Sequence, residues 1–171
     1  LGDSDQALLV ENALLQALRS TDPHATLAHL AYSGTAAVPR EVKPAQGIFL
    51  EFAPIHRRHD LPYAEQSGCE EALEHLEANL ELFGFQTAQV LEYWLDVSLF
   101  SQYKRPPKAI PWSRALFASD LDTYGGLGIH HITTFAVFAD CEYVSLYGIP
   151  PIAEYGKMLR EWNPQSLRRK I

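Results

Sequence analysis

The sequence is short of cysteine, of positive charge and of long apolar runs, and each shortage excludes a class of protein. Its only two cysteines, Cys69 and Cys141, cannot build a zinc site alone, and a disulfide between them has no support in the sequence. With 14 basic and 21 acidic residues, the formal net charge is −7, which argues against a nucleic-acid-binding surface. No apolar run approaches the roughly 18 residues of a membrane-spanning helix. We therefore predict no nucleic-acid partner and no membrane span.

Local motifs for nucleotide binding and for serine catalysis are also missing. The chain has no P-loop, no GxGxxG after an expected strand and no GxSxG nucleophile elbow. His56 and His59, followed by Asp60, have a spacing that invites a metal ion, but Arg57 and Pro62 favour a solvated loop. We predict no metal and no cofactor. A metal-dependent activity through the two histidines is the alternative.

What the sequence does contain is typical of one globular domain. The 171 residues are 47% hydrophobic and 20% charged, which is enough apolar material for a sizeable core over residues 1–171. Aromatic residues make up 11% of the chain, so some of them remain to stack on a ligand after the core is filled. The chain opens on Leu1 without a methionine, which we interpret as the interior of a longer protein. No compartment is predicted, although an extracytoplasmic location is compatible with this start.

Periodicity predicts alternating helices and strands. An Asp3-x-x-Gln6 capping box begins a helix whose apolar stripe includes Leu14 and Leu18. Helices are expected over about 3–19, 69–83, 113–124 and from Pro151 to Trp162, and strands over 25–32, 47–54, 87–95 and 131–138. Such alternation indicates parallel strands joined by right-handed crossovers. Four strands do not close a barrel, so the candidates are a small open α/β sheet and the C-terminal half of a (β/α)8 barrel.

Two carboxylates lie inside apolar strands, where an unpaired charge costs several kcal/mol. Glu51 interrupts Ile48–Pro54, and Glu92 interrupts the run that begins at Gln89. Parallel α/β folds bind ligands beyond the C-terminal ends of their strands. The polar and aromatic residues at these ends are Tyr32, Glu51, Glu92, Tyr93, Trp94, Asp96 and Asp140. A pair of carboxyl groups at such an edge is typical of glycoside hydrolysis, in which one protonates the leaving oxygen and the other attacks or activates water.

The same residues also have structural interpretations. Tyr32, Tyr93 and Trp94 would supply flat surfaces for sugar rings, or they would belong to the core. Glu51 would be catalytic or would pair with Arg57 or Arg40, and Glu92 would be catalytic or would support a catalytic neighbour. Asp96 and Asp140 would bind substrate or would cap the segments that follow them.

A family resemblance adds to these patterns. The segments that carry it are Ser4–Leu8, Leu30–Tyr32, Ile48–Pro54, Leu91–Asp96, Gly128–Asp140 and Tyr147-Gly148 with the final helix. In this order they resemble the barrel domain of unknown function 4838. The resemblance implies a glycosidase-like TIM barrel, similar to the barrels of alpha-glucuronidases and hexosaminidase-like proteins, in larger and mainly bacterial multidomain chains. It carries over Glu51 and Glu92 as the functional carboxylates.

Together these observations predict an α/β fold of four parallel β/α units, the C-terminal half of a (β/α)8 TIM barrel cut from a larger chain. The predicted function is hydrolysis of an oligo- or polysaccharide, with Glu92 and Glu51 as catalytic residues. The alternative is a non-catalytic carbohydrate-binding or scaffolding barrel. We further expect the fragment to dimerise or to depend on the missing half-barrel, because its edge strands would be unpaired. Hydrolysis requires both glutamates to face one pocket.

Overall fold

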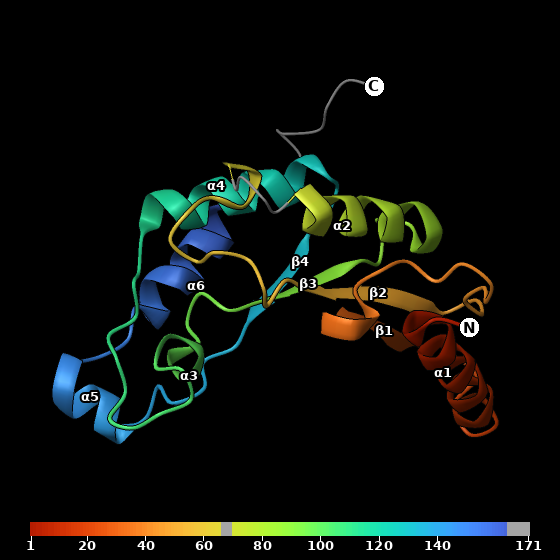
Figure 1. Ribbon diagram of the computed structural model, residues 1–171, viewed down its shortest axis with the longest axis horizontal. Helices are drawn as coiled ribbons and strands as arrows, with labels where there is room; N and C mark the ends of the chain where they lie inside the picture. Colours follow the sequence, from red (N-terminus) through yellow and green to blue (C-terminus); the bar gives the residue numbers. More distant parts are fainter. Residues whose placement is uncertain (66–69, 164–171) are drawn as a thin grey trace.

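A four-stranded parallel sheet organises the molecule (Figure 1). The computed structural model describes residues 1–65 and 70–163, so Cys69 lies outside the described residues. The strands pair in the order of the chain, and they are β1 (Leu27–Tyr32), β2 (Ile48–Ala53), β3 (Gln89–Glu92) and β4 (His131–Thr134). The helices are α1 (Asp3–Arg19), α2 (Glu70–Phe83), α3 (Val97–Phe100), α4 (Arg114–Gly126), α5 (Cys141–Tyr147) and α6 (Ile152–Glu161), with short 3-10 turns η1 (Ser33–Thr35) and η2 (Tyr63–Glu65). The predicted mixed α/β fold with a parallel sheet is confirmed.

The two faces of the sheet have different surroundings. Side chains alternate between faces along a strand, and on one face Ala31, Leu50 and Val90 are buried in a core under the helices. Figure 1 shows α2 and α4 lying along this side of the sheet. On the other face, the edge strand β1 exposes Leu30 and Tyr32. The sheet therefore has one helix-covered face and one open face.

The helices close the covered face with apolar stripes. From α4, Phe117 and Leu121 pack against β3 and β4, while α6 adds partly buried side chains to the same cluster. At the other end of the sheet, Leu8 and Leu15 of α1 pack on Ile48. None of the helices in the described ranges is both long and apolar enough to cross a membrane.

The last two strands are shorter than predicted. β3 ends at Glu92 because Tyr93 turns the chain, its carbonyl accepting a hydrogen bond from the Asp96 amide at 3.0 Å. β4 ends at Thr134, and the Phe135 backbone amide donates one further hydrogen bond to the Glu92 carbonyl at 2.9 Å. The residues that follow form α3 and α5, two short helices that the periodicity did not predict because each has too few turns for a stripe.

Several predicted helix ends are confirmed and others are wrong. Gly84 ends α2 with a left-handed backbone (φ 81°), and Ser113 caps α4. The Asp3–Gln6 capping box is wrong, because Gly2 is the N-cap and no side chain caps α1. α4 runs two residues beyond its predicted end at Tyr124, with Gly126 as its last residue and Leu127 as its C-cap. Leu14 and Leu18, expected in the core, are exposed on the outer side of α1.

Candidate functional site

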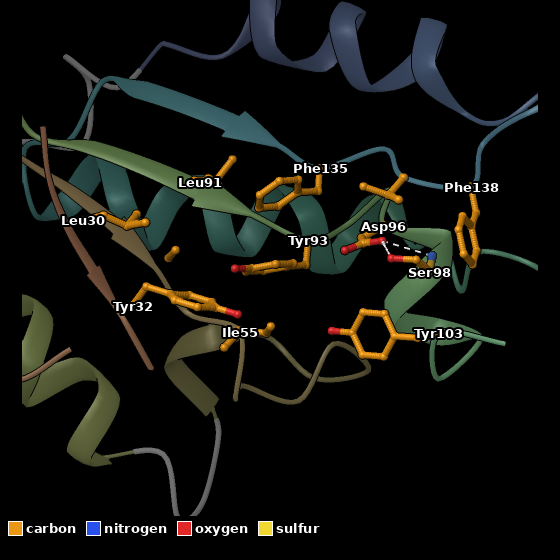
Figure 2. Close-up of a pocket in the computed structure, with 12 residues that line it drawn as sticks. Leu30, Tyr32, Ile55, Leu91, Tyr93, Asp96, Ser98, Tyr103, Phe135 and Phe138 are labelled. Atoms are coloured by element: carbon orange, nitrogen blue, oxygen red, sulfur yellow. Dashed lines mark hydrogen bonds between the residues drawn. The ribbon is translucent and has the colours of Figure 1, made fainter. Parts of the chain in front are cut away.

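A concave cavity of about 500 Å³ lies on the open face, at the C-terminal ends of the strands (Figure 2). Its walls are mostly apolar and aromatic, and the lining residues are Leu30, Tyr32, Ala53, Ile55, Leu91, Tyr93, Asp96, Ser98, Tyr103, Phe135, Val137 and Phe138. They come from β1, β2, β3, α3 and the loops after β2, β3, α3 and β4. The predicted location of a site, beyond the strand ends, therefore coincides with a real cavity.

Three tyrosines form the main surfaces of this cavity. The ring of Tyr93 is 3% exposed and stacks on Phe135, with ring centroids 5.2 Å apart. Tyr32 and Tyr103 stand at the rim with 36% and 64% of their surfaces exposed. Figure 2 shows their hydroxyl groups pointing toward each other across the cavity, beneath Tyr93. Burial, and then the nearby Tyr32, raise the pKa of Tyr93 well above its usual range, so this phenol stays neutral.

Asp96 is the one charged residue among the described lining residues. Its side chain is only 5% exposed. One oxygen, Oδ1, caps α3 by accepting from the Ser98 and Leu99 amides at 3.0 and 3.2 Å, and it also accepts from the Ser98 hydroxyl. The other oxygen, Oδ2, makes no hydrogen bond to a described residue. The prediction that Asp96 is a cap is confirmed, and the cap leaves half of the carboxylate available to the cavity.

Backbone strain is concentrated around the cavity. Within the described residues, the non-glycine residues with positive φ are Ser33, Gln102, Tyr103 and Phe138, at 48°, 54°, 58° and 64°. Tyr103 and Phe138 line the cavity, and the other two adjoin lining residues. Such conformations cost about 1–3 kcal/mol each and persist where the surrounding structure holds them, often at binding sites. Here they present two aromatic rings to the same space.

Glu92 lies on the opposite face of the sheet, fully buried under the helices. Its Oε1 accepts from Arg57 Nη1 at 2.7 Å and from the Tyr124 hydroxyl, while Oε2 accepts from the Tyr93 amide at 3.2 Å. Three donors, one of them the buried cation Arg57, thus occupy the carboxylate. The prediction that Glu92 faces a substrate pocket is wrong, because the strand register turns the side chain into the core.

The buried ion pair extends to a second carboxylate. Arg57 Nη2 lies 2.7 Å from Asp120 of α4, and Asp120 also accepts from Trp94 Nε1 at 2.9 Å and from the Tyr63 amide at 2.6 Å. Burial raises the pKa of Asp120, against the opposing effect of Arg57. Burial likewise disfavours the charged form of Arg57, but Glu92 and Asp120 outweigh it and raise the Arg57 pKa. The cluster links the loop after β2, the end of β3 and α4.

Glu51 is separated from Glu92 by the sheet itself. In the ladder Glu51 pairs with Gln89, and Phe52 pairs with the core residue Val90. Glu92 stands three positions after Gln89, so the two glutamates project to opposite faces. Glu51 is half-buried on the open face and makes no hydrogen bond or ion pair to a described residue. The expected pairing of Glu51 with Arg57 or Arg40 is wrong, because Arg57 pairs with Glu92 instead.

Two other predicted binding residues lie away from the cavity. Trp94 packs in the core with its ring 4.7 Å from that of Phe117, and its N–H is used by Asp120. Asp140 caps α5 through the Glu142 and Tyr143 amides and pairs with Arg105. The Arg105 hydrogen bond lowers the pKa of Asp140 to about 2. Both residues have structural roles, as their alternative interpretations predicted.

The loop after β2 differs from the solvated loop that the sequence predicted. Arg57 is buried, and the half-buried His59 lies between the rings of Tyr93 and Phe100, at centroid distances of 5.9 and 5.8 Å. Burial, and then the charge of Arg57, lower the pKa of His59 to about 4. In residues 1–65 and 70–163 no three His, Cys, Asp or Glu side chains converge as metal ligands would. His59 instead packs against the ring of Tyr93, which lines the cavity, and does not line the cavity itself.

Sequence reasoning found part of the cavity and missed the rest. Tyr32, Tyr93 and Asp96 were predicted and line it together. Tyr103, Phe135 and Phe138 were missed, since Tyr103 follows a helix of one turn and the other two were assigned to a longer β4. Comparison of the chain with family models, with curated proteins and with solved structures found no match in any of the three. The resemblance to the barrel domain therefore stays a prediction.

Proposed function

We propose that this protein binds carbohydrate in the aromatic cavity of the open face, as a non-catalytic binding domain. The observation that carries the proposal is the convergence of three tyrosines and one carboxylate oxygen on a cavity of about 500 Å³. The hydroxyls of Tyr93 and Tyr103 make no hydrogen bonds to described residues, and neither does Asp96 Oδ2. Polar groups without protein partners in a mostly apolar cavity are suited to an outside ligand.

A sugar matches both properties of these walls. Its ring presents C–H faces, which pack on aromatic rings, and its hydroxyls can both donate and accept hydrogen bonds. The apolar wall includes Leu91 and Phe135, while the phenols and Asp96 supply acceptors and donors. The volume is within the usual range for small-molecule sites, roughly 300–1,000 Å³. Tyr103 and Phe138, which carry two of the rings, both have a positive φ, a backbone conformation often found at binding sites.

Hydrolysis is the second candidate, with a different pair of residues. Glu92 is held by Arg57 in the core, whereas Glu51 and Asp96 both lie on the open side of the sheet. A retaining mechanism needs carboxyl groups about 5 Å apart and an inverting one about 6.5–9.5 Å apart. Turnover of aryl glycosides that is lost in both Glu51→Gln and Asp96→Asn would support hydrolysis. Turnover lost only in Glu92→Gln would return the catalytic role to Glu92.

We also propose that the four β/α units form half of a (β/α)8 barrel, whose lumen side is the open face. The parallel order β1-β2-β3-β4 and the helices on one face support this proposal. Under it, a second set of four strands, from a longer chain or a second copy, would cover Leu30 and Tyr32 at the edge. Size-exclusion chromatography with light scattering tests whether the chain associates with itself.

Calorimetric titration of the whole chain with methyl glycosides tests sugar binding. The informative variant is Tyr103→Gly, because glycine accepts the left-handed backbone at this position. Loss of one exposed stacking ring should weaken binding about tenfold, in line with roughly 0.5–1.5 kcal/mol for an aromatic contact. The matched control is Leu146→Ala, which removes an exposed apolar side chain from α5, outside the cavity lining. Equal affinity in both variants, or no sugar binding by the wild type, would contradict the proposal.

A further inference from the structure

The described lining of the cavity carries a single formal charge, and it is negative. This lining contains one acidic residue, Asp96, and no lysine, arginine or histidine. Asp96 is only 5% exposed, yet its Oδ2 makes no hydrogen bond to a described residue. A carboxylate oxygen that faces a cavity and has no protein donor attracts a donor or a cation from the ligand.

The carboxylate is also fixed in place. Oδ1 accepts from two backbone amides at the start of α3 and from the Ser98 hydroxyl. These three hydrogen bonds fix the orientation of the carboxylate and so set the direction of Oδ2. Figure 2 shows Asp96 on the cavity wall beside Tyr93, and the two are close enough for Asp96 to contribute to the raised pKa of that phenol. The negative charge of Asp96 thus lies next to the aromatic ring of Tyr93.

Aromatic faces add a second preference for positive charge. A cation within about 6 Å of a tyrosine or phenylalanine ring centre is attracted by the ring quadrupole. Five aromatic rings line this cavity, those of Tyr32, Tyr93, Tyr103, Phe135 and Phe138. Rings together with a carboxylate form the environment that proteins use to bind organic ammonium groups.

Two arginines near the cavity are already paired with carboxylates. Arg105 lies over the Phe138 ring at 4.0 Å, but it is paired with Asp140 and Glu142. Arg57 is buried in the core, where it forms ion pairs with Glu92 and Asp120. A ligand carboxylate would therefore meet Asp96 without a compensating cation in the described lining.

From these contacts we infer that the cavity selects amine-bearing sugars, with the ammonium group on Asp96 Oδ2 and the tyrosine faces, and rejects uronates. This inference rests on the proposed sugar-binding function and names its ligand class. The neutral sugar ring uses the apolar walls in either case. The amine adds an ion pair and cation–π contacts that neither a hydroxyl nor a carboxylate can make.

Titration calorimetry with the whole chain at pH 6.5 tests the inference with three probes, the methyl glycosides of glucosamine, glucose and glucuronic acid. We expect the glucosamine derivative to bind at least tenfold more tightly than the glucoside, and the glucuronide to bind least. The variant Asp96→Asn keeps an oxygen that can cap α3 and removes the charge. In this variant the preference for the glucosamine derivative over the glucoside should fall below threefold.

The outcomes separate the inference from the function on which it rests. If the glucoside binds and the glucuronide binds as tightly as the glucosamine derivative, the amine selection is overturned and the sugar site stands. If no glycoside binds, or cyclohexylamine binds as tightly as the glucosamine derivative, sugar recognition itself is overturned. Should Asp96→Asn fail to fold by circular dichroism, Tyr103→Gly serves instead. Removal of this ring should weaken the glucosamine derivative more than the glucoside, and equal losses would contradict the cation–π contact.

Discussion

Arg57 and Glu92 form an ion pair with both side chains fully buried and 2.7 Å between Nη1 and Oε1. Neither residue borders the aromatic cavity on the open face. The carboxylate that the sequence presents as the first choice for catalysis is therefore part of the core. Buried pairs of this kind specify geometry more reliably than they add stability, and removal of one partner leaves the other charge uncompensated. Here the pair, extended by Asp120, holds the loop after β2 against β3 and α4.

Glu92→Ala should lower the free energy of unfolding by about 3–5 kcal/mol, because it leaves Arg57 charged and buried. Urea denaturation followed by tryptophan fluorescence measures the change. The matched control is Asp60→Ala, which breaks the exposed Arg58–Asp60 contact of 2.6 Å and should cost at most about 1 kcal/mol. Similar losses in the two variants would show that the buried pair has no special role.

Glu51→Gln should change the free energy of unfolding by no more than about 0.5 kcal/mol, since this half-buried side chain has no partner among the described residues. Chemical denaturation of the variant beside wild type and Glu92→Ala provides the measurement. A loss above about 2 kcal/mol would mean that Glu51 is held by a strong interaction, and would contradict its assignment to the open face.

Trp94→Phe should destabilise the protein by about 1–3 kcal/mol and leave sugar affinity unchanged. The substitution removes the N–H that reaches Asp120 at 2.9 Å, and thus takes one donor from a buried carboxylate. Thermal unfolding and calorimetric titration give the two readouts. The comparison variant Tyr103→Gly should show the reverse pattern, with weakened binding and little loss of stability. A binding defect in Trp94→Phe would restore this residue to the ligand site.

Stability should fall as the pH is lowered from 6.5 toward 4, through the window set by His59. Burial and Arg57 depress the His59 pKa from 6.5 to about 4, so in this window the unfolded chain binds a proton that the folded chain does not. The contribution is complete above pH 6.5, and the loss by pH 4 amounts to at most about 3 kcal/mol at roughly 1.4 kcal/mol per pKa unit. Urea unfolding across this range measures it.

His59→Phe isolates this contribution, because the ring is retained between Tyr93 and Phe100 while the titrating group is removed. The difference in unfolding free energy between variant and wild type should increase in favour of the variant as the pH falls from 6.5 to 4. A difference that stays constant with pH would show that His59 titrates normally. The carboxylate Asp140 does not confuse the comparison, since its pKa of about 2 places its own transition below this window.

The parallel α/β arrangement could be predicted from local patterns, because it depends on features within short segments. Amphipathic spacing places α2 and α4 within a few residues, and Gly84 marks the end of α2. The sequence also indicated Asp96 and Asp140 as caps, because an aspartate directly before a new segment is a common N-cap residue. The helices α3 and α5 escaped prediction, because a helix of one or two turns has no periodicity to detect.

The sequence by itself determined the alternation of strands and helices, the placement of tyrosines and acids near the strand ends, and the excess of acidic over basic residues. The tertiary structure alone decided which acids share a face. The Glu51–Gln89 register puts Glu51 and Glu92 on opposite sides of the sheet, and a shift of one residue would have put them together. It also decided that Arg57 meets Glu92 across 35 residues and that Tyr103 joins the cavity. Register and loop packing depend on contacts between segments far apart in the chain, and no local pattern contains them.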